Sequence, residues 1–144
     1  MKRFAFPLES VRQWRSRQLE LEESRLQQVL AEREAIIARR RAMEEELKRE
    51  VALLAAPGLD AGQLAALDAF RRYVGAQGHR MAIDMRGCEQ RIEAQRKQVV
   101  EARRRFELLN RLRDKAARQW HADNDRELEN TAADLYLARC ARER

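Results

Sequence analysis

The chain has 144 residues, of which 38% are charged and 6% aromatic, with two prolines, five glycines and a formal net charge of +6. These proportions are typical of long helices and argue against a sheet protein or a chain with a large buried core. Charges of both signs are interspersed along the sequence and apolar residues recur periodically, which argues against disorder.

The first predicted helix runs from about Pro7 to Ala56. Pro7 suits the first turn of a helix, and Glu9 is favourable beside the positive end of the helix dipole. Pro57 and Gly58 then end the helix, because proline cannot continue it and glycine readily takes the left-handed conformation that closes one. The apolar row of this helix comprises Leu19, Leu26, Leu30, Ile37, Leu47, Val51 and Leu54, thickened by Val29, Ile36 and Met43.

A turn over residues 57–60 leads into the second predicted helix, from about 61 to 140. Asp60 can cap this helix with Gln63 reaching back, and Leu59 and Leu64 sit where a hydrophobic staple would join them. At ~1.5 Å per residue the two helices would be about 75 and about 120 Å long. Their lengths are therefore unequal.

The second helix carries an uninterrupted heptad row, with steps that alternate between four and three residues. Such a row predicts a left-handed coiled-coil seam against another long helix. The row comprises Met81, Met85, Cys88, Ile92, Gln95, Val99, Ala102, Phe106 and Leu109.

The short turn makes the two helices antiparallel neighbours, so we expect an all-α fold: one coiled-coil hairpin over residues 1–144. Centring the turn at Gly58 places Leu8 opposite Leu109 and Arg33 near Asp84, where an ion pair would fix the register. Helix two then overhangs helix one beyond about Leu112. Apolar residues on the overhang lack a partner in the chain, which indicates an external partner, although a frayed end is the alternative.

Chemical motifs are missing from the sequence. There is no GxSxG, no HExxH and no glycine-rich phosphate loop, and His79 and His121 are far apart, so we expect no enzyme, no cofactor and no metal. Cys88 and Cys140 show no CxxC or metal-ligand spacing and are expected to be free thiols in a reducing compartment.

The arginine triplets 39–41 and 103–105 are surrounded by acids and splay around a helix, so they favour a solvated face over nucleic-acid binding. Arg12, Arg15 and Arg17 fall opposite the 100–105 stretch. The end bearing both termini should therefore be basic and suit an acidic protein surface. No signal peptide follows Met1, and no apolar run approaches the roughly 20 residues that span a bilayer, so we expect a cytoplasmic chain without direct membrane insertion.

Both ends of the sequence resemble the flagellar FliJ family. The opening residues Phe4, Phe6, Leu8 and Glu9 match its aromatic-x-aromatic-x-Leu-Glu start, and Val11, Arg15, Glu20 and Leu26 continue the likeness. The closing block is similar in Leu108, Leu109, Leu112, Arg113, Trp120, Arg126, Glu127, Leu128 and Asp134. One departure is that Leu135 follows Asp134 where the family commonly has Glu.

The resemblance implies a non-enzymatic stalk of the flagellar type III protein export apparatus, peripherally associated with the inner face of the cell membrane. Its implied partners are the hexameric export ATPase, the cytoplasmic domain of the export gate membrane protein, and substrate export chaperones. The implied ATPase-ring contacts are Phe4, Phe6, Leu8, Arg12, Arg15, Leu112, Trp120, Leu128 and Asp134. The implied export-gate contacts are Met43, Leu47, Phe70, Tyr73 and Val74, for which ordinary seam packing is the alternative at Leu47 and Val74.

Three other interpretations stay open on the sequence. The equivalent stalk of a virulence-type secretion system would share this architecture. A homodimeric structural coiled coil could use the overhang to self-associate through Trp120 and Leu128. A nucleic-acid-binding coil would need affinity that weakens steeply with salt.

Overall fold

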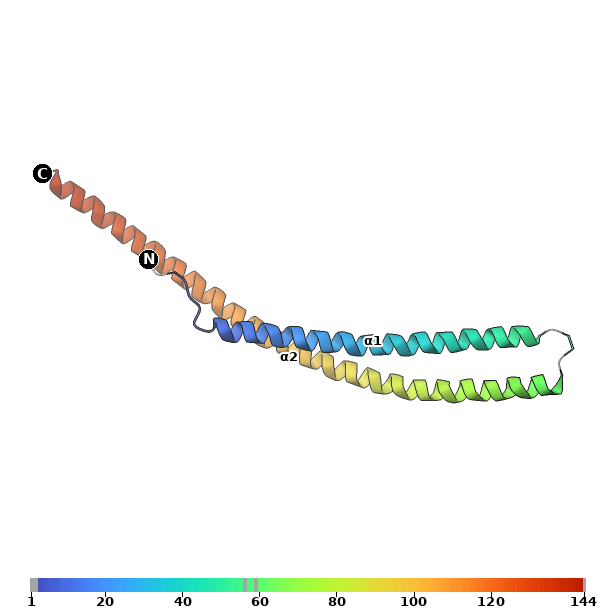
Figure 1. The fold of residues 1–144 in the computed structure, drawn as a ribbon. Coiled ribbons are helices and arrows are strands. Elements are labelled where there is room, and N and C mark those ends of the chain that lie inside the picture. Colours follow the sequence, from blue (N-terminus) through green and yellow to red (C-terminus); the bar gives the residue numbers. More distant parts are fainter. Residues whose placement is uncertain (1–2, 56, 59, 144) are drawn as a thin grey trace. The chain divides into compact units, whose positions relative to one another are not determined.

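The computed structural model describes residues 3–55, 57–58 and 60–143. It contains two helices, α1 (Glu9–Leu54) and α2 (Ala61–Arg142), and no strand among the described residues (Figure 1). The prediction of an all-α, two-helix fold is confirmed, with helix ends within two residues of those expected. Contacts group the chain into two compact units, Leu21–Val99, and Met1–Glu20 together with Val100–Arg144.

Helix α1 begins two residues after Pro7. The carbonyl of Leu8 accepts the first helical hydrogen bond, from the Arg12 amide at 2.9 Å, and the Glu9 amide donates to the Phe6 carbonyl at 3.1 Å. Pro7 therefore occupies the second position of a four-residue turn, which its fixed φ favours. Pro7 lies two residues before the helix begins, and not within its first turn as predicted.

The connection between the helices follows the predicted capping chemistry. Gly58 has a φ of 109°, the left-handed conformation expected there. The Asp60 carbonyl accepts the amides of Gln63 and Leu64, and the Asp60 amide donates to Gln63 Oε1 at 3.1 Å, the side chain reaching back as expected. The predicted staple involves Leu59, which lies outside the described residues.

In the unit Leu21–Val99 the predicted seam forms the core. Met81, Cys88, Ile92 and Val99 of α2 are buried, and the Cys88 side chain is fully covered. The α1 residues predicted for this unit are half-buried: Leu26, Val29, Leu30, Ile36, Ile37, Met43, Leu47, Val51 and Leu54. A seam of apolar side chains without a wide core is what a two-helix coiled coil provides.

Two polar contacts define the register of this unit. The Cys88 thiol donates to the Val29 carbonyl at 3.4 Å, and Gln95 Nε2 donates to the carbonyl and the carboxylate of Glu22. Both contacts agree with a turn centred at Gly58. The expected register is therefore confirmed for residues 22–29 against 88–95.

The ion pair expected to fix that register differs from the prediction. No ion pair joins Arg33 to Asp84 in the described part of the chain; Arg33 instead pairs with Glu34 at 3.0 Å. Its Nε is buried without a hydrogen-bond partner, because the guanidinium turns along its own helix toward the exposed Glu34. An ion pair that does cross between the helices of this unit joins Glu32 to Arg91 at 2.7 Å.

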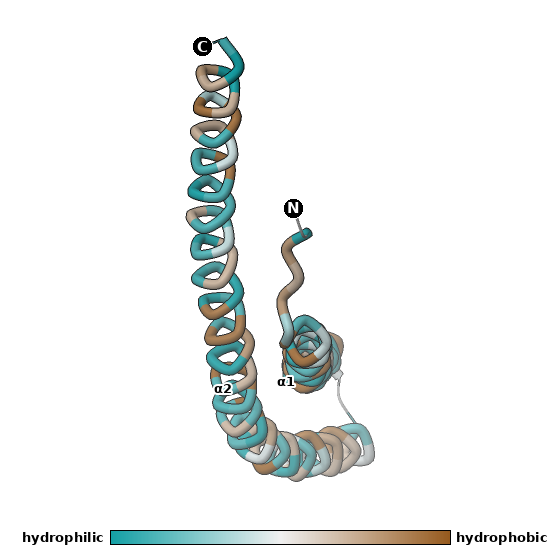
Figure 2. Tube along the Cα trace, turned by 90° about the vertical axis from the view of Figure 1, so that its left-hand side faces the viewer, coloured by the Kyte–Doolittle hydropathy of each residue, from teal (hydrophilic) through white to brown (hydrophobic). Residues whose placement is uncertain are grey.

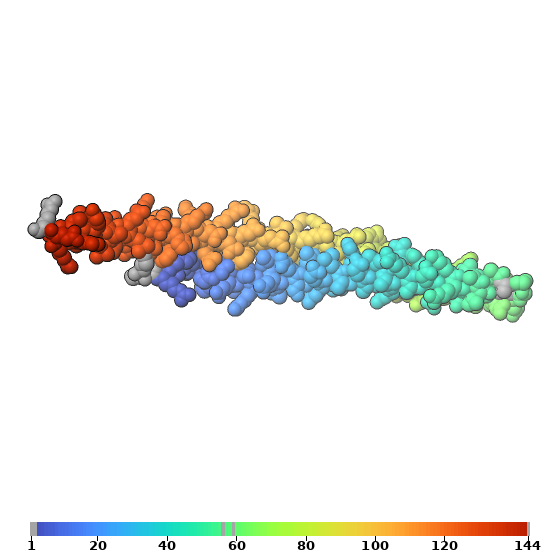
Figure 3. All heavy atoms as spheres, turned by 90° about the horizontal axis from the view of Figure 1, so that it is seen from above, coloured from blue at the N-terminus to red at the C-terminus, as the bar shows by residue number. Residues whose placement is uncertain are grey.

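In the other unit, α1 covers only the first part of the α2 segment. Phe106 and Leu109 of α2 and Leu19 of α1 are half-buried, as are Ala116, Ala117 and Trp120. Every residue from 125 to 139 is exposed, so α2 extends beyond its cover as predicted (Figure 3). We call residues 125–143 the overhang.

Apolar and polar residues alternate along α2, and apolar residues dominate the short segment before α1 (Figure 2). Neither helix, over its described residues, holds a stretch long and apolar enough to cross a lipid bilayer.

Candidate interaction surfaces

A polar network joins the start of α1 to α2. Glu9 forms an ion pair with Arg12 at 2.6 Å, Arg12 donates to the Asn110 side chain at 3.2 Å, and Arg113 lies 3.8 Å from Glu9. The Arg12 hydrogen bonds lower the pKa of the Glu9 carboxyl below its usual 4.5, and the same contact raises the pKa of Arg12. Arg12 is thus positioned by its own helix and held against the second.

An aromatic contact holds the segment before α1 against α2. The rings of Phe4 and Trp120 lie with centroids 6.1 Å apart and planes tilted by 59°, a spacing within the range of favourable aromatic pairs. His121 approaches the Trp120 ring edge-on at 5.0 Å. Phe4, Phe6 and Trp120 are all half-buried. The two ends of the sequence that carry the family resemblance therefore meet at this pair.

The remaining residues implied for the ATPase ring divide into two groups. Leu8 and Leu112 are about two-fifths exposed, while the half-buried Arg15 places its guanidinium 4.6 Å from the centre of the Trp14 ring. Leu128 and Asp134 lie on the overhang and are exposed. The structure thus brings Phe4 and Trp120 together, and leaves Leu128 and Asp134 apart from them.

The overhang exposes large apolar side chains. Leu128 is 49% exposed, and Leu135, Tyr136 and Leu137 are each more than 60% exposed. No described residue of α1 or of the segment before it contacts them by an aromatic pair, hydrogen bond or ion pair. Exposed leucine and tyrosine clustered within ten residues are typical of a surface that binds a protein partner.

Near the turn, an open groove runs between α1 and α2. It is lined by Leu54 of α1 and Phe70 of α2, with Glu46, Glu50, Gln63, Ala66 and Leu67. Of the residues implied for the export gate, Tyr73 is 57% exposed, whereas Phe70, which lines this groove, is half-buried, as are Met43, Leu47 and Val74. Tyr73 is therefore the exposed member of that set, and Phe70 is the member that borders the groove.

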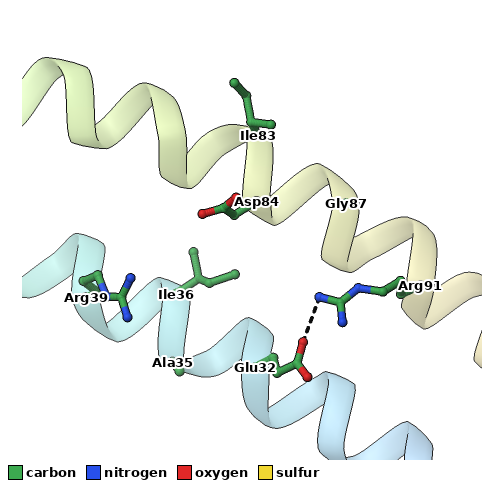
Figure 4. A pocket seen from close by; sticks show the side chains of 8 residues that line it. All are labelled: Glu32, Ala35, Ile36, Arg39, Ile83, Asp84, Gly87 and Arg91. Carbon is green, nitrogen blue, oxygen red and sulfur yellow. Dashed lines mark ion pairs between the residues drawn. The ribbon is translucent and has the colours of Figure 1, made fainter.

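A second groove, shown in Figure 4, was missed by the sequence reasoning. It lies between α1 and α2 beside the Glu32 to Arg91 ion pair, over Ala35 and Ile36 of α1 and Gly87 of α2. A Cβ added at Gly87 would have no neighbour within 4 Å, which shows how open the groove is there. The sequence feature that could have indicated it is a small residue on each helix, Ala35 and Gly87, in the lining of the groove.

Side chains that could bind a metal do not cluster in the described residues. No cluster of three His, Cys, Asp or Glu side chains that could hold a metal occurs over residues 3–55, 57–58 and 60–143. His79 and His121 are exposed, and both cysteines are free, with Cys88 buried in the seam.

Comparison of the chain with protein-family models, with curated proteins and with solved structures found no match in any of the three.

Proposed function

We propose that this chain is a non-enzymatic stalk of the flagellar type III protein export apparatus, and that its overhang enters the central pore of the hexameric export ATPase. The family resemblance of the two sequence ends supplies the identity of the apparatus. The chain would act in the cytoplasm, attached to the inner face of the membrane only through its partners.

One observation supports this role above the others: a helix of 82 residues carries a fully exposed stretch, 125–139, directly after a segment braced by a second helix. A pore element needs a single narrow helix at its tip and a stiff base behind it. The Phe4 to Trp120 contact and the Arg12 network provide the brace, and Leu128, Leu135 and Tyr136 provide apolar contacts for a ring of subunits.

Charge supports the same assignment. Arg12 and Arg15 lie in the braced segment, and their guanidinium groups suit an acidic collar on a partner. Phe6, Leu8 and Leu112 complete the ring contacts that we propose there, with Asp134 near the tip.

The remaining partners would use the other unit. Phe70 and Tyr73, near the turn, are the proposed contacts for the cytoplasmic domain of the export gate, with Met43, Leu47 and Val74 supporting them from the seam. Substrate export chaperones are a third class of proposed partner, and no described residue distinguishes their site.

The test is ATP hydrolysis by the purified export ATPase with and without this chain. Wild type should raise turnover and promote hexamer formation, while the double change Trp120→Ala and Leu128→Ala should abolish both effects, because two apolar contacts to the ring are lost. The matched control changes Leu64→Ala and Ile83→Ala, each also about half exposed but in the other unit, and should stimulate like wild type.

Two results would contradict the proposal. One is a rate that wild type leaves unchanged. The other is loss of stimulation in the control as well as in the Trp120→Ala and Leu128→Ala variant. Repeating the assay with the ATPase of a virulence-type system separates the flagellar stalk from its secretion counterpart, since the matching enzyme should respond more strongly. A wild type that leaves turnover unchanged but self-associates through Trp120 and Leu128 would favour the structural coiled coil.

A further inference from the structure

A second heptad row, separate from the seam, follows the outer face of α2. It starts at Arg104 and continues by alternate steps of four and three residues to Tyr136, over about 48 Å of helix. Every residue in it is exposed, so the row faces away from α1 throughout. We call this row the outer row. It comprises Arg104, Leu108, Arg111, Lys115, Arg118, Ala122, Asp125, Glu129, Ala132 and Tyr136, of which six are charged.

The charges of the outer row are segregated along the helix. Four cations occupy its first half and both anions its second half. Leu108 and Ala122 lie between charged residues, and Ala132 follows Glu129. None of the six charged side chains makes a hydrogen bond or ion pair within the described chain. Neighbours off the row are paired instead, such as Glu101 with Arg105 and Asp123 with Arg126.

A face that is basic in its first half and acidic in its second is complementary to itself when two copies run antiparallel. Symmetry about position 120 of α2 places Arg111 opposite Glu129 and Lys115 opposite Asp125, each twice by the two-fold axis. The same register places Arg104 opposite Tyr136, whose ring is 69% exposed and can accept a cation on its face. Small Ala132 falls opposite Leu108, which is 55% exposed and can pack there.

We infer that this face binds a second copy of the chain, giving an antiparallel two-fold dimer of α2 through the outer row. The contact is mainly ionic and exposed, so the dimer is weak and dissociates as salt rises. The inference is independent of the export apparatus. It also differs from self-association through Trp120 and Leu128, because neither residue belongs to the outer row.

Other occupants fit the outer row less well. Glu107 and Asp114 flank its basic half, and a duplex carries one negative charge per about 1.7 Å, so nucleic acid would meet repulsion on both sides. The acidic half and Tyr136 would have no role against nucleic acid. A second copy uses both halves of the row.

Sedimentation equilibrium at 50 mM and 500 mM salt tests the dimer, using the full chain and two charge reversals. Wild type should dimerise at low salt, and its dimerisation should be at least about tenfold weaker at high salt. Arg111→Glu and Glu129→Arg should each weaken dimerisation about 10- to 30-fold, because a like-charged pair then faces twice across the axis. Arg41→Glu, an exposed cation in the other unit, is the control with the same charge change as Arg111→Glu and should behave like wild type.

The decisive sample is an equimolar mixture of Arg111→Glu and Glu129→Arg. Each protein alone should dimerise more weakly than wild type, yet the mixture should recover dimerisation, because every reversed charge then meets an opposite one. The inference is overturned by a wild type that stays monomeric at low salt, by reversals that leave the dimer intact, or by a mixture that fails to recover. Loss of the dimer in the Trp120→Ala and Leu128→Ala variant, with both reversals dimeric, would assign self-association to the other face.

Discussion

At the scale of single residues, the start of α1 depends on one carboxylate. Glu9 receives hydrogen bonds from Arg12 on its own helix and lies 3.8 Å from Arg113 on α2. These contacts also hold Arg12 toward Asn110. Glu9 thus acts at the positive end of the helix dipole, in the ion pair with Arg12 and in the contact with Arg113 of α2. Protonation of its carboxylate should weaken all three interactions.

We expect the first turn of α1 to loosen in acid. The pKa of Glu9 is lower in the folded chain than its usual 4.5, chiefly through the Arg12 hydrogen bonds, so the contact stabilises the fold above pH 4.5 and is lost as pH falls through the lowered value. Amide hydrogen exchange of residues 9–13 should show this loss in wild type. Glu9→Gln should show weak protection at every pH; an identical acid response in both proteins would contradict the assignment.

At the scale of elements, the turn requires a glycine at position 58, whereas helix α2 does not require one at position 87. Gly58 needs its φ of 109°, whereas Gly87 is inside α2 with open space where a Cβ would point. Backbone conformation therefore decides what each position tolerates. Substitutions at Gly58 and Gly87 should therefore change the stability of the chain in opposite directions.

Gly58→Ala should destabilise the chain by about 1–2 kcal/mol, because an alanine pays that steric cost in the left-handed region. Gly87→Ala should stabilise it by up to about 1 kcal/mol through helix propensity. Urea unfolding followed by circular dichroism measures both changes. Equal effects of the same sign would contradict this account of the turn.

At the scale of the whole molecule, the sequence was sufficient for the elements and the seam. Burial of Met81, Cys88, Ile92 and Val99 follows directly from their spacing, and the register followed from one Pro-Gly break. These features depend on periodicity and chain length, which a sequence displays. The overhang was predictable for the same reason, since two helices of unequal length joined by a short turn leave one end uncovered.

Features that depend on small energy differences were not predictable in this way. Arg33 pairs with Glu34 and not with Asp84. The free energies of exposed ion pairs differ by less than about 1 kcal/mol, and residue spacing does not resolve such a difference. The groove over Ala35 and Gly87 depends on how the side chains of the two helices pack around these small residues, which spacing alone does not show. The proposed contacts with other proteins depend on surfaces that this chain does not contain.

The most direct test of the pore proposal is site-specific photo-crosslinking in the presence of the export ATPase and nucleotide. A photoreactive phenylalanine analogue placed at Leu128 should crosslink to ATPase subunits, and the same group at Leu64, which is as exposed but lies at the start of α2 beside the turn, should not. Crosslinks from Leu64 alone, or none from Leu128 while the ATPase is bound, would show that the overhang stays outside the ring.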